Sequence, residues 1–134
     1  MPERYIYHIT TETRWRIARS KGEYSAPSLE EEGFIHCSTM AQVFGVANAF
    51  YLDETDEVLL LELDSERIQA EVRYEAPNHP RAANDSVAAE NLFPHIYGKL
   101  NLDAVTRIYE MRRNDQYQFD QAHLTLYQDE TADE

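Results

Sequence analysis

Three short segments of this 134-residue chain repeat one pattern: an apolar residue, any residue, a histidine, any residue and a hydroxyl residue. The segments are Ile6–Thr10, Phe34–Ser38 and Phe93–Tyr97, with His8, His36 and His95 at their centres. Side chains two positions apart lie on the same face of a β-strand. Each segment is therefore predicted to be a strand that carries an apolar base, a central histidine and a hydroxyl at the rim.

If these three strands are neighbours, their histidine faces line one pocket with an apolar floor and a polar mouth. Such a pocket suits a small ligand that has a flat apolar part and polar edges. Neutral histidine both donates and accepts hydrogen bonds, and its charge changes near pH 6.5, so it can act as an acid or a base. We predict catalytic roles for His8, His36, His95 and Tyr97, the last because it shares a strand face with His95. A strand histidine can equally be a hydrogen-bonded packing residue, so the pattern leaves both interpretations open.

The second segment ends at Ser38, immediately before an amphipathic helix predicted over residues 40–51. The free N–H groups and the dipole at the start of a helix favour an anion. Ser38 and Thr39 are therefore predicted to bind a ligand, together with Tyr24 on the loop that precedes the second segment. The sequence from Thr39 to Gln42 also fits a capping box, which needs no ligand.

The other elements are irregular in order, which favours an α+β fold over regular βαβ alternation. We expect a helix over 12–20, a helical turn over 29–32 ended by Gly33, strands over 57–63, 70–75 and 105–111, a long loop over 76–92, and a strand or short helix over 117–127. Together these predict a single small domain over residues 1–115, with an antiparallel or mixed sheet and two main helices; the family resemblance described below implies that this sheet is split. Residues 116–134 are predicted to be a C-terminal extension with a frayed acidic tail.

Composition limits the partners. The formal net charge of −13 repels nucleic-acid phosphates, so a long nucleic acid is not expected, whereas a small anionic ligand can still bind locally. No apolar run approaches the roughly 18 residues of a membrane helix, and the N-terminal residues lack the features of a signal peptide. A cytoplasmic location is the resulting expectation, and oligomeric state is left open.

A zinc site is a competing chemical interpretation, because three histidines can bind zinc and leave one position open. No His-x-His or HExxH pair anchors such a site, and Cys37 points to the opposite strand face from His36. No metal is therefore expected, and metal-dependent hydrolysis is kept as an alternative.

The same segments carry a family resemblance. Ile6-Tyr7-His8-Ile9, the run Gly33-Phe34-Ile35-His36-Cys37-Ser38 and the run Phe93-Pro94-His95-Ile96-Tyr97-Gly98 resemble bacterial domain-of-unknown-function family 952, over about residues 4–112. The resemblance implies a fold similar to that of the ADP-ribosyltransferases and the RNA 2′-phosphotransferases, with a small split sheet and a cleft for a nicotinamide nucleotide. By position, His8 would match the first core strand of those enzymes, His36 with Ser38 the second, and His95 or Tyr97 the third. The third segment lacks the glutamate of classical protein ADP-ribosylation.

The resemblance implies binding of a nucleotide-like ligand of the NAD or ADP-ribose type, with NAD as the substrate of a glycosyl- or ADP-ribosyl-transferring or hydrolysing enzyme. A fold analogy does not supply an activity. A non-catalytic sensor that binds a nucleotide or small anion in the same pocket is therefore the alternative from another class.

Overall fold

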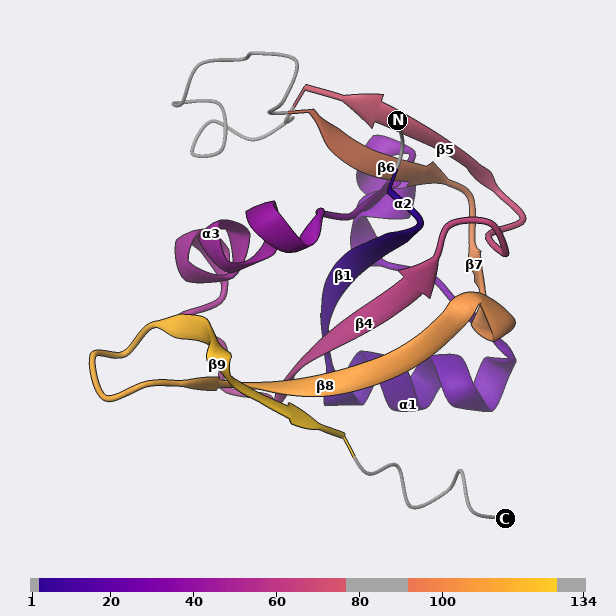
Figure 1. Ribbon diagram of the computed structural model, residues 1–134. Helices are drawn as coiled ribbons and strands as arrows, with labels where there is room; N and C mark the ends of the chain where they lie inside the picture. The colour runs from indigo at the N-terminus through magenta and orange to yellow at the C-terminus, as the bar shows by residue number, and fades with distance from the viewer. Residues whose placement is uncertain (1–2, 77–91, 128–134) are drawn as a thin grey trace.

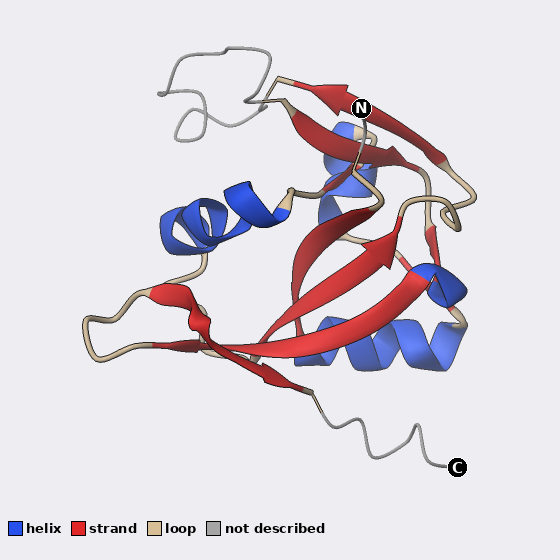
Figure 2. Cartoon of the chain, in the orientation of Figure 1, coloured by secondary structure: helices blue, strands red, loops and turns tan. Residues whose placement is uncertain are grey.

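A computed structural model describes residues 3–76 and 92–127 of the chain. In chain order its elements are β1 (Tyr5–Thr11), α1 (Glu12–Lys21), β2 (Glu23–Tyr24), α2 (Pro27–Glu32), β3 (Ile35–His36), α3 (Met40–Phe50), β4 (Val58–Asp64), β5 (Glu71–Glu75), β6 (Phe93–Tyr97), β7 (Leu100–Asn101), a 3₁₀ turn (Leu102–Ala104), β8 (Val105–Arg113) and β9 (Phe119–Leu126). The strands and helices are mixed along the chain, as Figures 1 and 2 show, which confirms the predicted small α+β architecture. No helix in the described ranges is long and apolar enough to cross a lipid bilayer.

The larger sheet has four antiparallel strands in the order β1-β4-β8-β9. Its inner strand β4 contains the run Val58-Leu59-Leu60-Leu61, whose side chains are buried on both faces. Leu59 and Leu61 belong to one apolar cluster, and Val58 and Leu60 to a second cluster on the other face. Successive side chains of a strand point to opposite faces, and both faces of β4 are covered by apolar clusters. Every position in this run therefore has to be apolar.

A three-stranded sheet, called the smaller sheet below, has the order β3-β6-β5, again with antiparallel neighbours, and β2 and β7 form a separate two-stranded pair. The three-stranded and four-stranded sheets are joined by a two-residue bridge beyond the end of β3. The Tyr7 N–H donates to the Ser38 carbonyl at 2.8 Å, and the Ser38 N–H donates to the Tyr7 carbonyl at 2.7 Å. This bridge connects β1 of the four-stranded sheet to the segment that follows β3.

The second histidine segment forms a shorter strand than the predicted range 34–38, since β3 is only Ile35–His36. The reason is a change of partner. The Cys37 N–H still donates to the Pro94 carbonyl of β6 at 3.0 Å, whereas Ser38 pairs with Tyr7 of β1. The predicted long loop over 76–92 falls almost entirely on residues 77–91, which lie outside the described part of the chain.

Local capping signals place the two long helices. The Thr11 hydroxyl accepts a hydrogen bond from the Arg14 N–H at 3.3 Å, and α1 ends at Gly22 in the left-handed conformation, with φ of 84°. At the start of α3, the Thr39 N–H donates to Oε1 of Gln42 at 2.9 Å. The predicted starts of both helices, at residues 12 and 40, are confirmed, because an N-cap threonine marks each of them.

The segment after residue 115 contributes to the larger sheet. β9 pairs with β8, and Phe119 at its start is buried in the second apolar cluster. Asn48 of α3 fastens this strand, because its Oδ1 accepts from the Phe119 N–H at 2.7 Å and its Nδ2 donates to the Phe119 carbonyl at 3.1 Å. The predicted boundary at 115 therefore falls inside the β8–β9 connection, and the part up to residue 127 belongs to the same folded unit.

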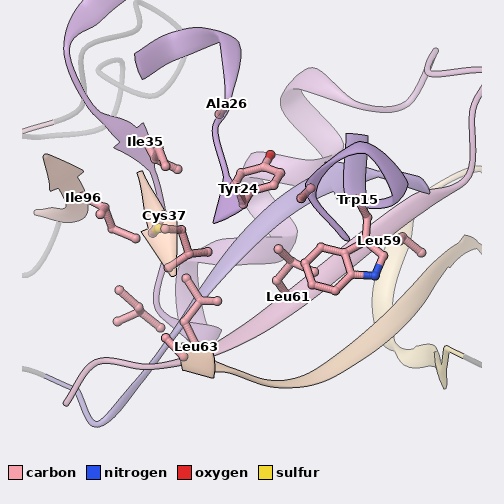
Figure 3. Packing of buried hydrophobic residues seen from close by; sticks show 13 residues of the cluster. Trp15, Tyr24, Ala26, Ile35, Cys37, Leu59, Leu61, Leu63 and Ile96 are labelled. Carbon is pink, nitrogen blue, oxygen red and sulfur yellow. The ribbon is translucent and has the colours of Figure 1, made fainter. Parts of the chain in front are cut away.

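One apolar cluster spans both sheets, and Figure 3 shows its side chains. It combines Leu59, Leu61 and Leu63 of β4 with Trp15 of α1 and Tyr24 of β2, and with Ile35, Cys37 and Ile96 near the smaller sheet. Because Ile35 and Ile96 point into this cluster, their neighbours His36 and His95 point to the opposite face of the smaller sheet. Core packing thus sets the direction of two of the three histidines.

A tight contact at Gly98, just after β6, makes a prediction about stability. Gly98 has φ of 155°, and a Cβ at this position would lie 2.9 Å from Cβ of Ala70. Gly98→Ala is expected to lower the free energy of unfolding by about 1–3 kcal/mol, through the clash and the backbone conformation. Urea denaturation measures this change.

Gly45 provides the matched control, because it lies within α3 and an added Cβ would meet no atom within 4 Å. Gly45→Ala is expected to raise the free energy of unfolding by about 0.5–1 kcal/mol, as is usual for glycine in a helix interior. Equal stability of the two variants would contradict the packing described at Gly98.

Candidate functional site

A cavity of about 430 Å³ opens between β1, the β3 segment, α2 and α3, and His8, His36 and His95 all line it. This volume lies within the range of small-molecule binding sites. The structure therefore brings together the three histidines that the sequence pattern singled out. Their environments differ, however, and each supports a different role.

His8 of β1 is buried and fully engaged. Its Nδ1 lies 2.5 Å from the His36 carbonyl, and its Nε2 lies 2.7 Å from the Tyr24 hydroxyl. Burial lowers the pKa of His8 to about 4, so the ring is neutral near pH 7. A carbonyl can only accept, so Nδ1 carries the proton and Nε2 accepts from Tyr24. The Thr10 hydroxyl, 2.9 Å from that of Tyr24, completes a buried chain of hydrogen bonds.

His36 of β3 is the most accessible of the three, with 42% of its side chain exposed. Its Nε2 lies 3.2 Å from both carboxylate oxygens of Glu32 on α2. The ring also packs edge-to-face against His95, with ring centroids 5.4 Å apart, because the two residues are directly opposed across the β3–β6 pair. His36 is thus placed to exchange protons with solvent or with a bound ligand.

His95 of β6 is held rigidly from two sides. Its Nδ1 donates to Oε1 of Glu75 on the neighbouring strand β5 at 2.8 Å. Its ring stacks on Phe34, with centroids 4.1 Å apart and 16° between the ring planes. Burial lowers the pKa of His95, and the Glu75 hydrogen bond opposes that shift only in part.

The second ring nitrogen of His95, Nε2, has no hydrogen-bond partner among the residues that the structure describes. The Nε2 atom is buried and makes no hydrogen bond to any residue in the described ranges. An unsatisfied buried polar atom costs about 1–3 kcal/mol, and most buried polar groups avoid that cost. His95 lines the cavity, and its Nε2 is the one side-chain nitrogen or oxygen in the described ranges that is buried without a hydrogen-bond partner.

Tyr97, the fourth predicted catalytic residue, does not line the cavity. Its hydroxyl donates to the same Glu75 oxygen at 2.5 Å, and this bond is the largest cause of the lowered pKa of Glu75. The guanidinium of Arg73 lies 4.3 Å from the centre of the Tyr97 ring. Tyr97 therefore supports Glu75 and, through it, His95.

The predicted ligand-binding residues are placed unequally. Tyr24 and Ser38 line the cavity, whereas Thr39 does not. The Ser38 N–H is committed to Tyr7 and the Thr39 N–H to Gln42, so neither is free for the phosphate that the sequence suggested. The prediction that each segment places a hydroxyl at the rim of the pocket is wrong for Thr10, whose side chain is fully buried.

Several residues of the site were missed by the sequence reasoning. Glu75 and Glu32 bind the two histidines of the smaller sheet, and Phe34 stacks on one of them. Arg14 of α1, which is exposed, also lines the cavity. Only Phe34 had a signal, because it occupies the apolar position of the repeated pattern.

The cavity wall carries both signs of charge. Among the described residues, its lining includes Arg14 and the acidic side chains of Glu31, Glu32 and Glu54. Acidic groups near a cavity favour a cationic or neutral ligand over a free anion, while the arginine offers one site for a phosphate or carboxylate. Within the described ranges, no group of three or more histidine, cysteine, aspartate or glutamate side chains is arranged to hold a metal ion.

Comparisons with known proteins identify the family. A model of the family described as "Protein of unknown function (DUF952)" matches residues 9–108, so the chain belongs to this family. No curated protein matches it.

Solved structures show the same fold. The crystal structure of protein CC0527 from Caulobacter crescentus is 23% identical and covers 88% of this chain and 95% of that one, with a TM-score of 0.72. The solution NMR structure of CC0527 is also 23% identical, covering 89% and 93% with a TM-score of 0.68. At this identity the likeness establishes the fold alone.

The burial of His8 predicts a specific pH dependence. The pKa of His8 is about 6.5 in the unfolded chain and about 4 in the fold, so the unfolded state binds more protons between these values. The stability from neutral His8 is complete above pH 6.5 and is lost as the pH falls toward 4. This loss amounts to roughly 3 kcal/mol. Urea denaturation at a series of pH values measures it.

In His8→Asn the side chain at this position cannot titrate. The difference in the free energy of unfolding between wild type and this variant should therefore shrink as the pH falls from 6.5 to 4. His123→Asn is the control, because His123 is exposed on β9 and bonds only Asp120 among the described side chains. A constant difference between wild type and His8→Asn from pH 7 to pH 4 would contradict the buried neutral ring.

Proposed function

We propose that the cavity binds a nucleotide-like small molecule of the NAD or ADP-ribose type, in a transferase or hydrolase that breaks the bond between nicotinamide and ribose. The observation that carries this proposal is the convergence of three histidines on one cavity, one of them with a buried, unpartnered nitrogen. An ADP-ribosyltransferase-like relationship is part of the proposal. The joining of two small sheets at Tyr7 and Ser38 supports it.

Charge supports this ligand class. The oxidised nicotinamide ring is cationic and flat, and the cavity offers it the aromatic rings of Tyr51 and Phe93 together with acidic side chains such as Glu32. Arg14 supplies a cation for the diphosphate end. The mixed wall thus suits a ligand with a positive ring and a negative diphosphate better than it suits phosphate alone.

The reaction follows from the same groups. The bond from ribose C1′ to the nicotinamide nitrogen breaks, and its electron pair leaves with neutral nicotinamide. The acidic side chains stabilise the oxocarbenium-like ribose, as fixed charges do for a transition state. Water or an acceptor hydroxyl then forms the new C1′–O bond, and its proton passes to Nε2 of His95 or to the His36 ring.

A non-catalytic sensor is the second candidate, and one observation favours it. Glu75 on β5 is the carboxylate next to the third histidine segment, β6. It does not line the cavity, and its carboxylate already accepts hydrogen bonds from His95 and Tyr97, so it is not placed to contact a ligand as a catalytic glutamate would be. Ligand binding without turnover would then be the outcome. By mass action such binding still stabilises the fold.

Two measurements test the proposal: thermal stabilisation by NAD, which reports binding, and release of nicotinamide from NAD, which reports turnover. NAD at about 100 times its Kd should raise the melting temperature by roughly 5–10 °C. Chromatography should detect nicotinamide released from NAD by the wild-type protein. His36→Ala and His95→Ala should each reduce release at least tenfold, because they remove the proton acceptors.

His123→Ala is the matched control, since His123 does not line the cavity, and its release rate should equal that of wild type. Stabilisation without release would favour the sensor. If NAD, NADP and ADP-ribose neither stabilise the protein nor lead to release of nicotinamide, the nucleotide proposal is ruled out.

A further inference from the structure

The contact between Glu75 and His95 determines which ring nitrogen carries hydrogen. An ionised carboxylate can only accept, so the Nδ1 atom 2.8 Å from Glu75 must be the donor. The Tyr97 hydroxyl donates to the same oxygen, which favours the ionised form of Glu75. The stack on Phe34 fixes the plane of the ring. Glu75 and Phe34 together therefore set both the tautomer and the direction of Nε2.

The environment of Nε2 indicates that it carries a lone pair. With Nδ1 already protonated, a proton on Nε2 would make the ring a cation with a buried N–H that no described residue accepts. Glu75 would pair with such a charge through Nδ1, but taking the charged ring out of water adds a desolvation cost that the neutral ring avoids. Burial also lowers the pKa of His95, in agreement with a neutral ring.

We infer that Glu75 is a positioning residue that holds His95 in the Nδ1–H tautomer, so that the cavity selects ligands whose polar group donates a hydrogen bond to Nε2. This deepens the proposed function and rests on it for the identity of the ligand. A carboxamide, a ribose hydroxyl or an attacking water can donate to Nε2. A carboxylate or an ionised phosphate cannot, and would leave two acceptors facing each other.

The nearest side chains are consistent with this selection. His36 is edge-to-face with His95, and its own Nε2 lies near Glu32. Glu32 adds negative charge to the same part of the wall. A ligand carboxylate at this position would therefore meet both a lone pair and a carboxylate, whereas an amide would meet two acceptors that it can satisfy.

The first experiment needs no ligand. Long-range ¹H–¹⁵N spectra of the uniformly labelled full chain at pH 7 distinguish the two neutral tautomers from the charged ring, and His95→Gln assigns the signals of His95. We expect the Nδ1–H tautomer in the wild type. In Glu75→Gln the amide can donate to Nδ1, and the ring should change toward the Nε2–H tautomer.

The control is Glu110→Gln, which changes the net charge equally. Glu110 pairs with Arg112 on β8 and does not line the cavity. Its spectrum should match that of the wild type for His95. The wild-type spectrum alone decides which tautomer the His95 ring adopts, even if Glu75→Gln fails to fold.

The second experiment compares two probes that differ only in the polar group. Nicotinamide presents an amide donor, and nicotinic acid presents a carboxylate at pH 7. Calorimetric titration should show at least tenfold tighter binding of nicotinamide to the wild type and to Glu110→Gln. In Glu75→Gln this preference should shrink at least fivefold, because Nε2–H now donates.

The outcomes separate the two proposals. An Nε2–H or charged ring in the wild type overturns the inference, whatever binds. The Nδ1–H tautomer with equal binding of the two probes overturns the selection rule. The Nδ1–H tautomer with no binding of nicotinamide, nicotinic acid or NAD overturns the nucleotide proposal and the ligand half of the inference, and leaves the role of Glu75 in place.

Discussion

Two backbone hydrogen bonds between Tyr7 and Ser38 connect the four-stranded sheet to the three-stranded sheet, and the cavity depends on them. The bridge places His8 of β1 beside the β3 segment, so that its ring nitrogen reaches the His36 carbonyl. His36 in turn lies directly opposite His95 across the β3–β6 pair. This junction brings His8 of the four-stranded sheet to His36 and His95, which share the three-stranded sheet.

The three histidine rings differ in hydrogen bonding and exposure because their surroundings differ. His8 is a neutral, fully bonded part of the framework that links Tyr24 to the β3 backbone. His95 is fixed by Glu75 and Phe34, and its Nε2 makes no hydrogen bond within residues 3–76 and 92–127. His36 is half exposed. The proposed function assigns binding and proton transfer to this combination of one rigid, one oriented and one accessible histidine.

Local sequence signals predicted the elements well. The alternation in Phe93–Tyr97 matches β6, and the apolar run from Val58 matches β4. Thr11 and Gly22 mark the ends of α1 as their conformational preferences require. The shared cavity was predictable too, because the repeated pattern already placed three histidines on strand faces.

The partners of those histidines were not predictable. Glu75 meets His95 only because β5 pairs with β6 in a register that no local pattern specifies. The β8–β9 pairing escaped prediction for the same reason, since β9 is stabilised by contacts such as Asn48 with Phe119 that join residues 71 positions apart. Tertiary pairing, rather than propensity, decided both.

The most direct test of a shared ligand site is an NMR titration of the histidine rings with ADP-ribose. The signals of His36 and His95 should move together and fit one dissociation constant, and those of exposed His123 should stay unchanged. Unchanged His36 and His95 signals at saturating ADP-ribose, or separate dissociation constants for the two rings, would contradict a single site built from these strands.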